Sequence, residues 1–237
     1  MTTATHGSDL AADLACAAFA LATRFAAGAT MWSVAPESEP HALHIAVEFV
    51  HPVVIGKRAL PAVALTGHDL VDQLRLSVRS GDVVIAVAGA DHEQVRAVMR
   101  RGPAWGATTV WIGNGQRPPA GAADHVLWLT EHDPAAATSG AYVLLYHLLW
   151  ELTHVCFEHP GPLTPARPSG DVCLTCSDHA DLGEVISQTT GDTATVRTAA
   201  GNRTVVTTPV GPLTSGELVL IHAGTAIGRP AYEEPRP

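Results

Sequence analysis

One segment, residues 82–88 (DVVIAVA), constrains the fold of this chain more than any other. It is apolar at every position after its aspartate, and it follows the turn-forming pair Ser80-Gly81. A strand that does not alternate apolar and polar residues must be covered on both faces, which is typical of parallel sheets. The segment therefore predicts a buried strand with helices on both sides of its sheet.

Segments with helical spacing alternate with strand-like segments through the first two thirds of the chain. The predicted helices cover residues 8–28, 41–50, 69–78, 91–101 and 135–157, and the predicted strands cover residues 30–34, 61–65, 82–88, 108–112 and 126–129. This alternation is typical of a parallel sheet built from strand–helix–strand units. We therefore expect an α/β domain over residues 1–158.

The pattern changes after residue 158. Residues 159–171 include four prolines and two glycines, a composition that cannot hold a regular helix or strand. Short β-branched runs follow, separated by glycine-containing turns, at residues 184–187, 194–197, 203–207 and 217–221. We expect a linker at residues 159–171 and then a small all-β, OB-like barrel within residues 172–237.

Composition excludes several classes of protein. A hydrophobic fraction of 46% is too high for a disordered chain. Fourteen Lys and Arg against 23 Asp and Glu give a net charge of −9, which argues against nucleic acid as a partner. Glu151 and two histidines, His147 and His154, interrupt the most apolar run, at 141–157, so we expect no membrane span. Asp9 and Asp13 precede the apolar run at 15–22, which is atypical of a secretory signal, and we predict a cytoplasmic protein.

Two motifs mark the predicted barrel. Cys173 and Cys176 form a C-x-x-C pair, which could bind a soft metal or cycle through a disulfide. Residues 218–227 read LVLIHAGTAI, with His222 near their centre. His179 follows Cys176 by three residues and could join the two thiols and His222 in a soft-metal set. The alternative is that the thiols and His222 are purely structural.

Together these motifs resemble the HypC/HupF family of hydrogenase-assembly chaperones, in which a leading cysteine and a terminal His-Ala-Gly motif flank a small β-barrel. The resemblance implies a protein that passes the iron fragment of nickel–iron hydrogenase from a maturation scaffold protein to the hydrogenase large subunit. It implies transient iron or partner binding at Cys173 or Cys176, with His222 nearby. The family's cysteine is N-terminal whereas these are internal, so both thiols remain candidates, with Cys173 preferred.

Histidine is unusually abundant, with 13 residues against 4 Phe, 3 Tyr and 5 Trp, and imidazole suits both metal binding and acid–base chemistry. His44 and Glu48 lie four residues apart on one predicted helix and therefore share a face. His147 and Glu151 repeat this spacing on the last predicted helix. Two histidines and a glutamate from two helices could bind a divalent metal. The alternative is an ordinary surface His–Glu pair on each helix.

Residues 38–65 (SEPHALHIAVEFVHPVVIGKRALPAVAL) resemble the phosphoheptose isomerase branch of the SIS (sugar isomerase) family, which has an H-x-x-x-E helix followed by a basic loop and a similar strand. The resemblance implies an SIS-like, flavodoxin-like three-layer fold and a homo-oligomer, either a dimer or a tetramer. It implies that His44, Glu48 and His147 bind zinc. In the family the glutamate and histidine also act as base and acid in aldose–ketose isomerisation, which implies these roles for Glu48 and His147.

The chain departs from the family at the substrate site. Ser139 replaces the family's glutamine ligand, and residues 87–92 (VAGADH) replace its hydroxyl-rich phosphate loop. Glu37 and Asp91 add negative charges that would repel a phosphate group. These changes argue against an active sugar-phosphate isomerase.

These motifs support a binding function and, as an alternative, an enzymatic one. The main prediction is a hydrogenase-maturation accessory chaperone, a binding protein whose C-terminal domain docks the iron fragment or the large subunit. Its SIS-like domain would then serve oligomerisation or metal binding. The alternative is a zinc-dependent sugar-phosphate isomerase with an accessory β-domain. A third reading is an oligomerisation scaffold with neither metal nor substrate.

Overall fold

The computed structural model describes residues 6–129, 140–159, 180–189 and 191–231. The chain forms two compact units, one made mainly of residues up to 165 and the other mainly of residues 166–237. The predicted linker at 159–171 falls outside the described residues except for His159, so its limits stay a prediction. Among the described helices, none is long and apolar enough to cross a membrane.

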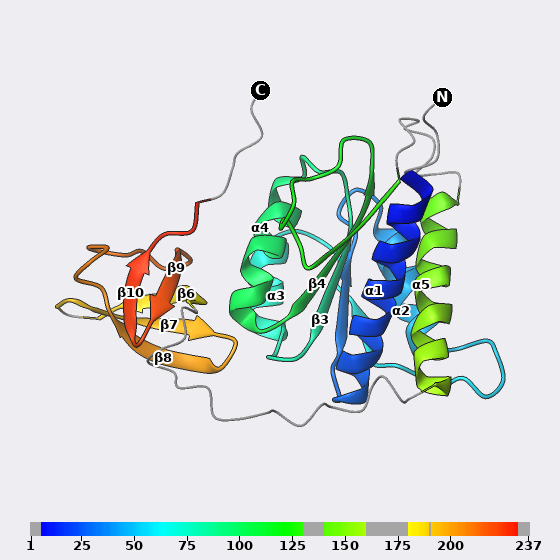
Figure 1. Ribbon diagram of the computed structural model, residues 1–237, viewed down its shortest axis with the longest axis horizontal. Coiled ribbons are helices and arrows are strands. Elements are labelled where there is room, and N and C mark those ends of the chain that lie inside the picture. The colour runs from blue at the N-terminus through cyan, green and yellow to red at the C-terminus, as the bar shows by residue number, and fades with distance from the viewer. Residues whose placement is uncertain (1–5, 130–139, 160–179, 190, 232–237) are drawn as a thin grey trace. The chain divides into compact units, whose positions relative to one another are not determined.

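The first unit is a five-stranded parallel sheet with helices on both faces, as the sequence predicts (Figure 1). Its strands are β1 (Met31–Val34), β2 (Ala62–Ala64), β3 (Val83–Val87), β4 (Thr108–Asn114) and β5 (His125–Leu129), and its helices are α1 (His6–Ala26), α2 (Glu39–Val50), α3 (Leu70–Ser77), α4 (Glu93–Arg101) and α5 (Ala141–Glu158). A 3₁₀ turn, η1 (Gly102–Trp105), follows α4. The strand order is β2-β1-β3-β4-β5, so the chain reverses direction across the sheet between β1 and β3.

The central strand β3 is buried along its whole length. Val83, Ile85 and Val87 belong to a core cluster that also contains apolar side chains of α1, α2 and α5. Successive strand residues point to opposite faces, so Val84 and Ala86 face the other layer. Helices α3 and α4 cover that other face (Figure 1). The sheet therefore holds α2 and α5 together on one side.

The second unit is a closed barrel of five strands in the order β10-β8-β7-β6-β9. These strands are β6 (Asp181–Gln188), β7 (Thr193–Thr198), β8 (Gly201–Val206), β9 (Leu218–His222) and β10 (Thr225–Gly228). The predicted small barrel is confirmed, although the β-branched segments of the sequence predicted only four of its five strands and missed β10. Strand β10 pairs in parallel with β8 and antiparallel with β9.

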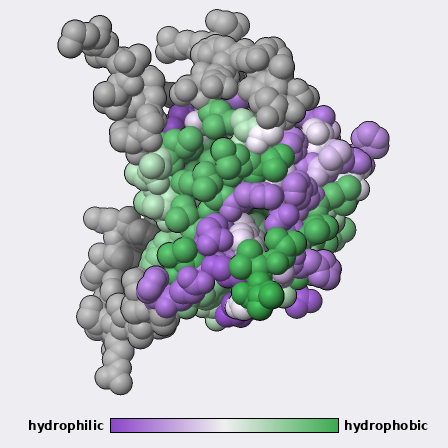
Figure 2. All heavy atoms as spheres, turned by 90° about the vertical axis from the view of Figure 1, so that its right-hand side faces the viewer, coloured by the Kyte–Doolittle hydropathy of each residue, from purple (hydrophilic) through white to green (hydrophobic). Residues whose placement is uncertain are grey.

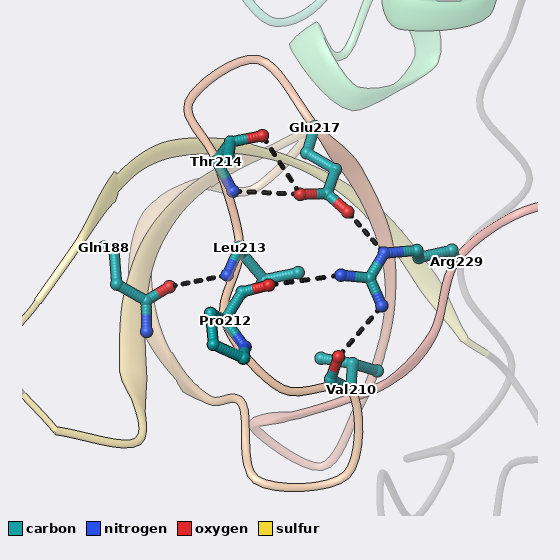
Figure 3. Close-up of polar contacts among 7 residues, drawn as sticks. All are labelled: Gln188, Val210, Pro212, Leu213, Thr214, Glu217 and Arg229. Atoms are coloured by element: carbon teal, nitrogen blue, oxygen red, sulfur yellow. Dashed lines mark hydrogen bonds and ion pairs between the residues drawn. The ribbon is translucent and has the colours of Figure 1, made fainter.

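A polar network fastens the loop between β8 and β9 to the end of β10 (Figure 3). The Arg229 guanidinium pairs with the Glu217 carboxylate and donates to the carbonyls of Val210, at 2.9 Å, and Pro212, at 3.2 Å. Glu217 also accepts the backbone N–H of Thr214 at 2.9 Å. Burial raises the pKa of Glu217, but the bonds from Thr214 and Arg229 outweigh it, so the pKa lies below its ordinary value. The carboxylate therefore stays ionised in this network.

Candidate metal centre

Helix α2 positions two of the predicted ligands. It begins after Ser38 with Glu39 and Pro40 in its first turn, where an acidic residue and a proline both favour a helix start. Its buried stripe consists of Ala42, Ile45, Ala46 and Phe49. His44 and Glu48 lie one turn apart beside this stripe and are only partly buried.

Helix α5 brings the third predicted ligand to the same place. The Nε2 atom of His44 lies 3.2 Å from the Nε2 atom of His147 and 3.2 Å from Oε1 of Glu48. The distance between His147 Nε2 and Glu48 Oε1 is 3.5 Å. The predicted convergence of these three side chains is therefore present. Glu151 does not join them, because it pairs with Lys57 at 3.4 Å.

The three ligand atoms form an almost equilateral triangle that fits a small divalent metal. Zinc bonds to nitrogen and oxygen are about 2.0–2.2 Å long, and tetrahedral angles then separate neighbouring ligand atoms by about 3.3–3.5 Å. The separations of 3.2, 3.2 and 3.5 Å lie within about 0.1 Å of this range. Two histidines and one carboxylate are also a known catalytic zinc set, which leaves a fourth position for substrate. The side chains of His44 and His147 are 38% and 41% exposed, so this position can be reached from solvent.

A buried tyrosine supports the triangle. The hydroxyl of Tyr146 lies 2.9 Å from Nδ1 of His44, the ring nitrogen outside the triangle. Burial and the charge of Glu48 raise the pKa of Tyr146 to about 12, so the phenol keeps its proton near neutral pH. Tyr146 could not be identified from the sequence, because no spacing rule relates a tyrosine to a histidine on another helix.

A second feature lies at the carboxyl ends of β1 and β3. The backbone N–H of Gly89, just after β3, donates to the Glu37 carboxylate at 3.2 and 3.4 Å. Open α/β sheets bind ligands at the point where the strand order reverses, which here lies between β1 and β3. Glu37, identified from the sequence as an added charge, therefore occupies a backbone donor at the end of the sheet where such folds bind ligands.

Tyrosine and histidine side chains connect the surroundings of Glu37 to the triangle. Burial and the nearby charge of Glu37 raise the pKa of Tyr142 to about 12. The ring of His41 packs edge-on against Tyr142, with centroids 5.5 Å apart, and against Tyr146, with centroids 6.0 Å apart. Glu37 and the three predicted ligands therefore belong to one polar region along α2 and α5.

The remaining predicted site residues do not form a described centre. Cys173, Cys176, His179 and Ser139 lie outside the described residues. His222 is partly buried at the end of β9. Within the described part of the chain, the one group of three or more His, Cys, Asp and Glu residues able to hold a metal is His44, Glu48 and His147.

The parallel sheet and its helices match the SIS-like α/β fold. No protein-family model matches the chain, and no curated protein matches its sequence. A phosphoheptose isomerase from Francisella tularensis is similar in structure, with a TM-score of 0.53 and 15% identity, over 60% of this chain and 85% of that one. At this identity the likeness concerns the fold alone.

Two other solved structures have lower scores. A candidate sugar-phosphate isomerase from Listeria monocytogenes has a TM-score of 0.42 and 18% identity, over 60% of this chain and 83% of that one. A candidate phosphosugar isomerase from Bacillus subtilis has a TM-score of 0.39 and 19% identity, over 54% of this chain and 38% of that one.

The main functional prediction, a hydrogenase-maturation chaperone, is wrong. The similar structure from Francisella tularensis is a phosphoheptose isomerase, and neither the family models nor the curated proteins give a match that supports a likeness to the HypC/HupF chaperones. The motif at 218–227 has a structural explanation, because it forms the hairpin of β9 and β10. Ala223 and Gly224 at its tip have φ angles of 46° and 80°, as a tight two-residue hairpin turn requires. A small closed barrel therefore accounts for this motif without a hydrogenase partner.

Proposed function

We propose that the protein is a metal-dependent aldose–ketose isomerase of the sugar-phosphate class, with zinc held by His44, Glu48 and His147. The triangle of ligand atoms carries this proposal, because its sides match tetrahedral zinc. The fold shared with a phosphoheptose isomerase from Francisella tularensis gives further support.

The reaction moves one proton between neighbouring carbons of the sugar and a second between their oxygens. A bound metal would polarise the carbonyl group. Glu48 turns Oε1 toward both imidazoles, which leaves Oε2 to take the proton from the carbon beside the carbonyl and return it to the adjacent carbon. His147, whose Nε2 atom would face the metal, would give its Nδ1 proton to the carbonyl oxygen and regain one from the neighbouring hydroxyl. Proton and electron counts are unchanged, so no further reactant is needed.

We propose further that a second copy of this chain covers the surface around the triangle. Leu43 and Val47 on α2 and Leu144 and Leu148 on α5 are each between 44% and 63% exposed. Figure 2 turns the α5 side of Figure 1 toward the viewer, and hydrophobic residues gather there among polar ones. An apolar surface beside a solvent-accessible site is typical of a protein interface, and a homo-oligomer would bury it and enclose the substrate.

The barrel would then be an accessory domain. We infer an OB-like type from its five strands, their closed order and the parallel pairing of β8 with β10.

Elemental analysis and an isomerase assay test the function together. We expect stoichiometric zinc in the purified protein, lost in His44→Ala, and conversion of a heptose or other sugar phosphate, reduced by about 10²–10⁴-fold in Glu48→Gln. Glu151→Gln, which alters the glutamate outside the triangle, should leave both properties unchanged. Absence of zinc binding, or turnover that survives Glu48→Gln, would refute the assignment.

A further inference from the structure

We propose that Tyr146 is a positioning residue that holds the His44 ring in the orientation needed to bind the metal. This inference rests on the proposed metal site. The observation behind it is the 2.9 Å contact between the Tyr146 hydroxyl and Nδ1 of His44. The opposite ring nitrogen, Nε2, is the atom that belongs to the ligand triangle. Tyr146 thus fixes one end of the imidazole while the other end faces the metal position.

The tyrosine is a rigid support. It is 1% exposed and belongs to the core cluster, where Leu145 and Leu149 of the same helix are also buried. Its ring meets the His44 ring at 75° with centroids 5.2 Å apart, so the two rings restrict each other's rotation. A phenol locked by packing presents its oxygen in one direction, and the direction of the hydrogen bond is therefore set by the core.

The chemistry of imidazole explains why this contact matters. A neutral imidazole carries one N–H, so a metal bound at Nε2 requires the proton to be at Nδ1. In histidine ligands this N–H almost always donates a hydrogen bond to an acceptor, and loss of the acceptor typically lowers the metal affinity by about 10–100-fold. The Tyr146 oxygen is placed to accept it. In the metal-free protein the same phenol can donate to Nδ1, which places the His44 proton on Nε2, facing Glu48.

Tyr142 offers a matched control. It lies one helical turn before Tyr146, is 4% exposed, and has a pKa raised to about 12 by burial and by Glu37. Its ring contacts His41 rather than His44. Replacement of either tyrosine by phenylalanine removes one hydroxyl from the same buried helix face, and only Tyr146→Phe removes the contact with His44 Nδ1.

The test compares zinc affinity in the wild-type chain, Tyr146→Phe and Tyr142→Phe, by competition with a zinc indicator. Tyr146→Phe should bind zinc about 10–100-fold more weakly, whereas Tyr142→Phe should change the affinity by less than about threefold. Melting temperatures verify that both variants fold. ¹⁵N NMR of the metal-free chains adds a second readout, in which Tyr146→Phe should move the His44 Nδ1 resonance and Tyr142→Phe should not.

The outcomes separate this inference from the proposed function. A wild-type chain that binds no zinc refutes the metal-dependent function and the positioning role with it. Tight zinc binding in the wild type, combined with equal affinity and an unmoved His44 resonance in Tyr146→Phe, refutes the positioning role alone. If Tyr146→Phe cannot fold, the NMR spectrum of the wild-type chain still decides, since a Tyr146 bond requires an Nδ1 shift typical of a hydrogen-bonded acceptor.

Discussion

Replacement of Asp82 by alanine should destabilise the α/β unit by about 3–4 kcal/mol. Asp82 is 6% exposed, and its carboxylate accepts three hydrogen bonds. Thr30 N–H donates to Oδ1 at 2.9 Å, while Trp32 Nε1–H and Arg79 N–H donate to Oδ2 at 3.0 and 2.9 Å. Alanine leaves all three donors without this acceptor, and each such loss costs about 1–3 kcal/mol. We use the lower part of this range because the donors are only partly buried, so water can replace some of the lost bonds.

Urea unfolding followed by tryptophan fluorescence measures this effect, since four of the five tryptophans belong to the α/β unit. The midpoint should fall while the slope stays constant, and the melting temperature should drop by about 10 °C. Asp72→Ala is the control, because this exposed carboxylate pairs with Arg75 on the surface of α3 and should contribute less than about 1 kcal/mol. A loss in Asp82→Ala no greater than in the control would refute the role of the carboxylate.

Glu37→Gln removes the negative charge held at Gly89 N–H and should raise the affinity for inorganic phosphate roughly tenfold, as measured by calorimetry. An unchanged affinity would contradict the idea that Glu37 blocks a phosphate-binding donor. Leu144→Glu should reduce the mass measured by light scattering to the 24.7 kDa monomer, and a wild-type chain that is already monomeric would exclude the proposed oligomer. Burial lowers the pKa of His125 against the opposing charge of Asp124, so its contribution to stability is complete above pH 6.5 and is lost as pH falls through the lowered pKa. The urea midpoint of His125→Gln should therefore fall less between pH 7 and 5 than that of the wild type, and identical slopes would contradict this.

The first unit could be predicted because its signals are local. The run at 82–88 became the fully buried β3, and the helical spacing at 41–50 became α2. The fifth barrel strand, β10, was missed for an equally local reason. Its four residues, Thr225–Gly228, are too few to show alternation, and the turn that creates it is visible only in the positive φ angles of Ala223 and Gly224.

The site was only partly predictable. Helical geometry places His44 beside Glu48 from sequence alone, but His147 joins them only because the sheet holds α5 against α2. The contact of Tyr146 with His44 depends on the rotation of α5 about its own axis, which the sequence does not reveal. The short motif around His222 misled the functional prediction, because a hairpin turn and a partner-binding motif can share the same few residues.

The triangle and the Glu37–Gly89 contact differ in the substrate groups that they favour. His44, Glu48 and His147 suit a carbonyl and a hydroxyl group beside a metal, which any aldose or ketose provides. At the carboxyl end of β3, a phosphate dianion would have to displace the Glu37 carboxylate from Gly89 N–H before it could use that donor. Since both are anions, they compete for the same backbone donor and repel each other at short range. Under the proposed function, the affinity for a phosphorylated sugar would depend on how readily Glu37 turns away, so Glu37 is the residue to vary first when substrates are compared.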